Sequence, residues 1–95
     1  MFDIAQLKPE HFETLIGSNL PIVDSDFSFT IRTVERLKSP SPRSEPFTLS
    51  LTAPPNTRGI QGIYHLRHPQ LGVLEVFLVP TAPVDGQPQF EAVFN

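Results

Sequence analysis

Apolar and polar residues alternate along most of the chain after residue 20, with the two-residue period of half-buried β-strands. The clearest case is the segment 47–52, where Phe or Leu alternates with Thr or Ser at every position. In the segment 73–79, by contrast, residues of both parities are largely apolar. The pattern predicts six strands, at about residues 20–23, 27–37, 47–52, 62–68, 73–79 and 89–94.

The pattern before residue 20 has a helical period. Pro9 suits a first helical turn and Gly17 suits the position just after a last one, so we expect one short helix at about residues 8–16. Phe12, Leu15 and Ile16 would share one face of this helix. We expect that face to pack against the sheet.

Turn residues separate the predicted strands at short intervals. Asp85 and Gly86 fit a tight hairpin turn, a bulge is expected near residues 32–34, and Pro80 is expected to end the strand at 73–79. Residues 38–46 contain three prolines and few apolar side chains, which indicates a surface loop. The pattern predicts a mainly β, antiparallel fold in a single domain (1–95): a small, partly closed barrel or rolled sheet of about six strands, with the helix covering one side or plugging an end.

Composition narrows the possible chemistry. The chain of 95 residues has no Cys, so thiol nucleophiles, thiolate metal sites and disulfides are excluded. Its start lacks the basic and apolar pattern of a secretory signal, and no apolar run approaches the ~20 residues that span a bilayer. We therefore expect a soluble, cytoplasmic protein.

No motif of a known catalytic or cofactor site is present. His65 and His68 form the most suggestive pair, but an odd separation places them on opposite faces of a strand, which argues against a shared metal ion. The serines lie outside any nucleophile elbow, and the glycines form no phosphate-binding loop. We predict no catalytic, cofactor-binding or metal-binding residue, and hence a protein that is not an enzyme.

The strongest functional signal is that the predicted strands carry more apolar side chains than the core side needs. Four apolar side chains have the parity opposite the predicted core: Ile63, Phe77, Val79 and Val93. Either the helix covers them or they form a face for a protein partner or a second copy of the chain. Our leading hypothesis is a structural or protein-interaction module that uses this face or an edge strand.

Other hypotheses rest on polar residues. A barrel that binds a small ligand could use a mouth lined by Tyr64, His65 and Arg67, and an enzyme could use His65 with Glu75. Binding of nucleic acid would rely on four basic residues around the proline-rich loop, Arg32, Arg36, Lys38 and Arg43. The net charge of −3 works against that last hypothesis.

Four short motifs in the C-terminal third occur in a fixed order: QGIY at 61–64, HPQLG at 68–72, FLVP at 77–80 and AVFN at 92–95. Together they resemble a family of small bacterial domains of unknown function, whose members typically carry Q-G-x-Y, H-P-x-L-G, F-L-V-P and A-V-F-N. The resemblance implies a compact β-rich unit with no enzymatic activity attached to it. It also implies an accessory role, because such domains are often encoded near phage-tail-like, tail-collar-type proteins.

Overall fold

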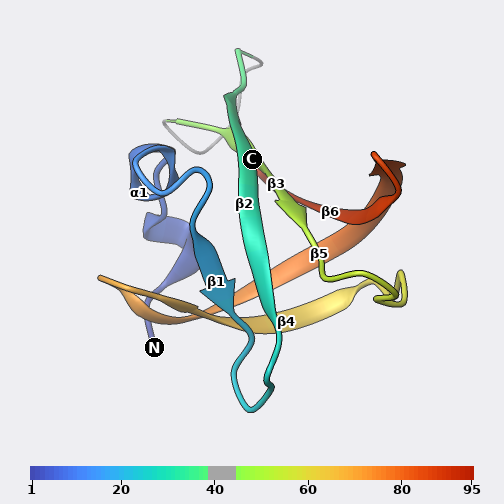
Figure 1. Cartoon of the computed structure of the whole chain (residues 1–95). Helices are drawn as coiled ribbons and strands as arrows, with labels where there is room; N and C mark the ends of the chain where they lie inside the picture. Colours follow the sequence, from blue (N-terminus) through green and yellow to red (C-terminus); the bar gives the residue numbers. More distant parts are fainter. Residues whose placement is uncertain (39–44) are drawn as a thin grey trace.

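The computed structural model describes residues 1–38 and 45–95, and these residues form six antiparallel strands in a nearly closed barrel (Figure 1). The predicted mainly β fold is confirmed. The elements, in chain order, are the 3-10 turn η1 (Ile4–Gln6), the helix α1 (Glu10–Glu13) and the strands β1 (Asn19–Pro21), β2 (Ser28–Arg36), β3 (Phe47–Thr52), β4 (Gly62–His68), β5 (Gly72–Val84) and β6 (Gln87–Phe94).

The strand order is β1-β2-β3-β6-β5-β4, so the barrel consists of two three-stranded meanders joined through the antiparallel pair β3–β6. The other ends of the two meanders meet at β1 and β4. A bridge pairs Ile22 with Leu66, and the Val23 N–H donates to the His65 carbonyl oxygen over 2.9 Å. These contacts bring the sheet almost back onto itself, which leaves few unpaired strand edges.

The side chains of the inward-facing strand residues fill the barrel interior. Phe29 and Phe90 lie at its centre with ring centroids 5.3 Å apart, and Phe47 stacks on Phe94 at 4.7 Å. In the first half of β5, Leu74, Val76 and Leu78 are buried and alternate with less buried residues, as the pattern predicts. The buried apolar core comprises Leu7, Phe12, Leu20, Phe29, Ile31, Phe47, Leu49, Leu51, Ala53, Leu66, Leu74, Val76, Leu78, Phe90, Ala92 and Phe94.

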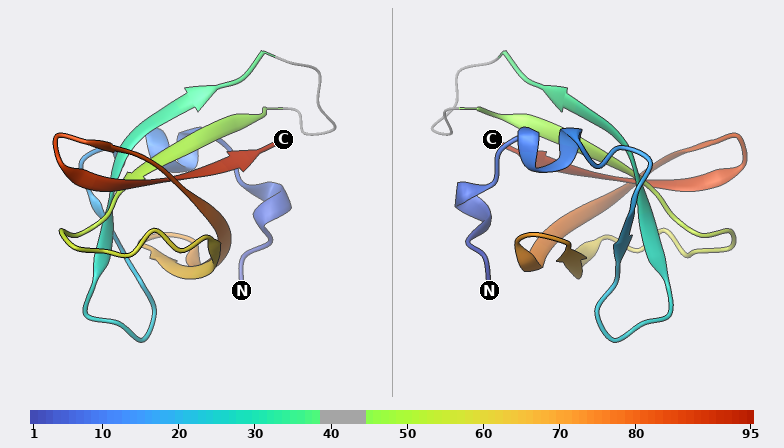
Figure 2. Two further views of the ribbon diagram at one scale, coloured as in Figure 1. Left: turned by 90° about the vertical axis from the view of Figure 1, so that its right-hand side faces the viewer. Right: turned by 60° about the vertical axis from the view of Figure 1, so that its left-hand side comes forward.

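The N-terminal helix is shorter than the pattern predicts. It covers four residues instead of about nine, because the turns that follow it carry the chain toward β1. Phe12 is fully buried and Leu15 packs partly on the core, but Ile16 remains exposed, so the expected three-residue face is wrong at that position. The helix packs beside β2, and η1 contacts β5 (Figure 2).

Strand β5 is longer than predicted, and Pro80 does not end it. Pro80 pairs with Phe90, and the strand continues to Val84. The Ala53 N–H donates to the Pro88 carbonyl oxygen, so even-numbered residues of β6, including Phe90, direct their peptide groups to β3 and not to β5. Pro80 therefore sits where the β5–β6 ladder needs no N–H group.

Two predicted turn features are confirmed. Asp85 and Gly86 both have positive φ, 51° and 77°, and connect β5 to β6 as a two-residue hairpin turn. The register of β2 against β3 shifts between Ile31 and Thr33, so Arg32 forms the expected bulge. From there the Arg32 Nε–H reaches across to the buried Gln89 Oε1 over 2.9 Å, and the Thr52 hydroxyl donates to the same oxygen over 3.0 Å.

Candidate functional site

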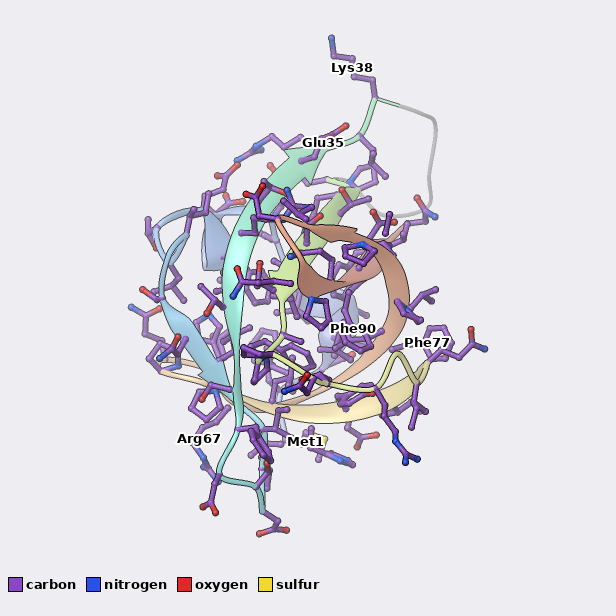
Figure 3. All side chains as sticks on the ribbon, turned by 45° about the vertical axis from the view of Figure 1, so that its right-hand side comes forward. Met1, Glu35, Lys38, Arg67, Phe77 and Phe90 are labelled. Atoms are coloured by element: carbon purple, nitrogen blue, oxygen red, sulfur yellow. The ribbon has the colours of Figure 1, made fainter. Side chains whose placement is uncertain are left out.

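The four apolar side chains predicted on the outer parity all lie on the barrel surface. Ile63, Phe77, Val79 and Val93 are between 38% and 63% exposed, so the N-terminal segment leaves them accessible. Figure 3 shows the contrast on neighbouring strands, with Phe90 enclosed by the strands and Phe77 on the outer side. We call these four residues the outer apolar patch.

The patch surrounds a hollow where β5 and β6 diverge. Phe77, Val79 and Val93 line it together with Ile4 of η1 and with Glu91, and its volume is about 440 Å³. Ile63 lies beside it, because Ile63 pairs with Phe77 across β4 and β5. We call this cavity the outer hollow.

The strand register explains the hollow. Pairing between β5 and β6 begins at Val79 and Glu91, whereas the earlier part of β5 pairs with β4 and the last residues of β6 pair with β3. Odd-numbered residues of β6 direct their peptide groups toward β5. The β5–β6 pairing does not extend to Val93, so the peptide groups of Val93 face the hollow without a paired residue on β5. The hollow therefore combines apolar side chains with strand backbone.

The residues predicted to form a ligand mouth are not brought together. Tyr64 points inward, with its ring 5.6 Å from Phe29 and 5.8 Å from Phe90, while His65 and Arg67 are exposed on the outer side of β4. Their alternation along a strand is the reason. His65 does lie opposite Glu75 in the register, but both side chains are exposed, and neither lines the outer hollow.

His68 has a structural place that the sequence did not reveal. It is buried, with its ring 5.5 Å from that of Phe12. Its Nδ1 accepts the N–H groups of Gln70 and Leu71, at 3.1 and 3.2 Å, so the proton is on Nε2, which donates to the His11 carbonyl oxygen over 2.8 Å. His68 thus joins the β4–β5 turn to α1.

Two of the predicted basic residues, Arg32 and Arg36, are engaged by other side chains. Arg36 donates to both carboxylate oxygens of Glu13, at 2.9 and 3.0 Å, and also lies near Glu10 and Glu45. The hydrogen bond from Arg36 lowers the pKa of Glu13 below its ordinary value, and the same bond raises the pKa of Arg36. Arg32 is bonded to Gln89, Lys38 is exposed, and Arg43 lies outside the described residues.

A second concavity, which sequence analysis missed, lies between the β1–β2 turn and the β3–β4 loop. We call it the hairpin pocket. Its volume is about 290 Å³, it shares no residue with the outer hollow, and it is lined by Ile22, Phe27, Phe29, Pro54, Pro55, Asn56, Thr57 and Tyr64. The exposed Phe27 was the available signal, since an aromatic residue beside the turn residues 24–26 has no strand neighbour to cover it.

Two kinds of feature are absent from the part of the chain that the structure describes. Within residues 1–38 and 45–95, no three His, Cys, Asp or Glu side chains are grouped so that they could hold a metal ion. In the same ranges, no helix has the length and apolar character required to cross a membrane.

The fold and its surface define a small antiparallel β-barrel domain with a filled interior and an apolar outer patch. A family model, described as a domain of unknown function (DUF6916), matches residues 7–94, and the chain belongs to that family. No curated protein matches the chain, and no solved structure does.

Proposed function

We propose that the protein is a non-enzymatic interaction module that binds a partner protein at the outer apolar patch and the outer hollow. The observation that carries the proposal is the exposure of Ile63, Phe77, Val79 and Val93 on one face. Four large apolar side chains grouped on a small domain are typical of a surface that another molecule covers.

The shape of the hollow specifies how a partner would bind. Its floor contains inward residues of β6, and its walls are apolar side chains of β5, β6 and η1. Val93 adds peptide groups that a further strand could pair with. We therefore propose that the partner supplies an extended segment with at least one large apolar side chain, which enters the hollow while its backbone pairs with the peptide groups of Val93.

The alternative of an enzyme that uses His65 with Glu75 has weaker support, because both groups lie outside the two pockets. The alternative of a barrel that encloses a small ligand lacks an interior cavity among the described residues, since the core side chains fill it. No specific observation favours either one over the interaction module.

The resemblance noted from the sequence motifs directs the search for the partner. We propose that the protein acts in the cytoplasm as an accessory of a phage-tail-like assembly, and that the partner is encoded by a neighbouring gene. Products of these genes can be expressed together with the protein and purified through a tag on one of them.

The experiment compares three forms of the protein in such co-purifications. One is unchanged, one carries Phe77→Ser with Val93→Ser, and one carries Ile16→Ser. Ile16 and Phe77 are both 52% exposed, but Ile16 lies outside the outer hollow. We expect the first and third forms to retain the same partner and the second to lose it. Equal retention by all three forms would refute the proposed face.

Self-association is a separate outcome of the same design. Sedimentation over a wide concentration range will show whether the unchanged protein forms dimers that Phe77→Ser abolishes. If it does, the partner is a second copy, and the proposal of a different partner protein is wrong.

A further inference from the structure

The hairpin pocket has the composition of a site for an apolar ligand. Three of its lining side chains are aromatic, Phe27, Phe29 and Tyr64, and two are proline rings, Pro54 and Pro55. Its volume is about 290 Å³, just below the range of roughly 300 to 1,000 Å³ that is typical of sites for small organic molecules.

One wall holds an exposed aromatic ring on a fixed backbone. Phe27 is 60% exposed, yet its N–H donates to the Ser25 hydroxyl over 3.0 Å and its carbonyl oxygen accepts the Ile22 N–H over 2.9 Å. Because the backbone beside the exposed ring is already held by hydrogen bonds, less conformational entropy is lost when a ligand binds there. Phe27 is therefore positioned to contact a ligand rather than to fill the core.

On the other wall, both hydroxyl groups already donate hydrogen bonds within the protein. The Thr57 hydroxyl donates to the Pro54 carbonyl oxygen over 2.6 Å, and the Tyr64 hydroxyl donates to the Ile60 carbonyl oxygen over 2.5 Å. A polar metabolite would find few groups to bond. Both hydroxyl oxygens can still accept a hydrogen bond, but they have no proton left to donate, so apolar and ring contacts must supply most of the binding.

Charge at the pocket differs between its two walls. Asp24 and Asp26 are exposed in the turn between Ile22 and Phe27, and neither takes part in an ion pair with the rest of the described chain. Arg58 follows Thr57 on the opposite wall and is also exposed. A ligand with a basic group would be favoured with that group on the side of the turn.

We infer that the hairpin pocket binds a proline-rich segment of another protein, with proline rings against Phe27 and Tyr64 and a basic residue beside Asp24 and Asp26. Such segments adopt an extended helix before they bind, and aromatic grooves are their usual receptors. The site is separate from the outer apolar patch, and its occupant does not depend on the partner proposed above.

Tyr64 provides a direct readout, because the chain has one Tyr and no Trp. The probe is a synthetic peptide of six prolines followed by one arginine, which is itself free of aromatic residues. We expect this peptide to change the Tyr64 fluorescence in a saturable way and to shift the backbone amide resonances of Phe27 and Thr57. The matched peptide has alanine in place of every proline, and we expect it to bind at least about tenfold more weakly.

Two variants test the two parts of the recognition. Phe27→Ala is expected to weaken binding about tenfold or more, as loss of a central aromatic contact does. Asp24→Asn with Asp26→Asn is expected to weaken it less, and to remove most of its salt dependence. Phe27 is outside the core, so the fold of Phe27→Ala, checked by circular dichroism, is expected to persist.

Phe77→Ser serves as the control that separates this site from the outer hollow, and it is expected to bind the peptide as the unchanged protein does. Absence of any shift at Phe27 and Thr57 with the unchanged protein would overturn the inference. Equal binding of the alanine peptide would also overturn it. The inference would also be overturned if a free apolar molecule such as indole shifted the resonances of Phe27 and Thr57 and the proline peptide did not.

Discussion

The inner and outer faces of β4, β5 and β6 have similar chemistry but different surroundings. Leu78 and Phe90 point inward and are fully buried, whereas Phe77 and Val79 point outward from the same stretch of β5 and stay exposed. The inner face has the second meander to pack against. On the outer face, η1 borders the hollow but leaves Phe77 and Val79 exposed, so apolar composition alone does not say which face holds the fold together and which can bind a partner.

Loss of an inner side chain should have the largest effect. Phe90 is fully buried and its ring contacts those of Phe29 and Tyr64. We expect Phe90→Ala to lower the free energy of unfolding by about 3–5 kcal/mol, because it removes apolar contacts and leaves a cavity. Urea unfolding followed by circular dichroism measures this change. A loss below about 1 kcal/mol would mean that Phe90 is not part of a packed interior.

The two histidines of β4 allow a similar comparison, because His68 is buried and His65 is exposed on the outer side. We expect His68→Ala to cost about 1–3 kcal/mol, because it leaves the turn N–H groups and the His11 carbonyl oxygen without their partner. His65→Ala is the matched variant on the outer side and should change stability by no more than about 0.5 kcal/mol. Amide hydrogen exchange at Leu71 should accelerate in the first variant only. Equal effects of the two variants would contradict the described tautomer and contacts of His68.

Loss of an outer side chain should have little effect on folding. Phe77→Ser removes a cross-strand contact with Ile63, so we expect a loss of about 1 kcal/mol or less. The same urea titration used for Phe90→Ala gives the comparison under identical conditions. If the Phe77 variant loses as much stability as the Phe90 variant, the outer apolar patch is part of the folding core and not a free surface.

The smallest expected effect is a pH dependence of the contact between α1 and β2. Arg36 lowers the pKa of Glu13, so the stabilisation is fully present above the ordinary value of 4.5 and is lost as the pH falls through the lowered pKa. Both groups are largely solvated, so the global stability should change little. A carbon-detected NMR titration of Glu13 measures the pKa directly. In Arg36→Gln it should return toward 4.5, and an unchanged value would contradict the ion pair.

Strand alternation predicted the parts of the fold that depend on local pattern. The parity of 47–52 separated its buried from its exposed side chains, and the parities of 62–68, 73–79 and 89–94 together identified the four members of the outer apolar patch. The helix was overestimated, since Ile16 has suitable spacing but stays exposed. The end of β5 was misplaced, because whether Pro80 is tolerated depends on which neighbour its peptide group faces.

The two concavities could not be predicted from one sequence. The outer hollow exists because β5 changes its pairing partner from β4 to β6 along its length. The hairpin pocket exists because the β1–β2 turn lies beside the β3–β4 loop, two segments about thirty residues apart in the chain. Both are consequences of strand register and barrel closure, which the pattern of any single segment does not contain.

The most direct test of the central claim is photocrosslinking in cells that express the protein with its neighbouring genes. A benzophenone amino acid replaces Phe77 in one form and Ile16, which is equally exposed, in the other. We predict that position 77 gives a discrete crosslinked product with one partner protein and that position 16 does not. No product at position 77, or the same products at both positions, would contradict the claim that the outer apolar patch is a specific binding surface.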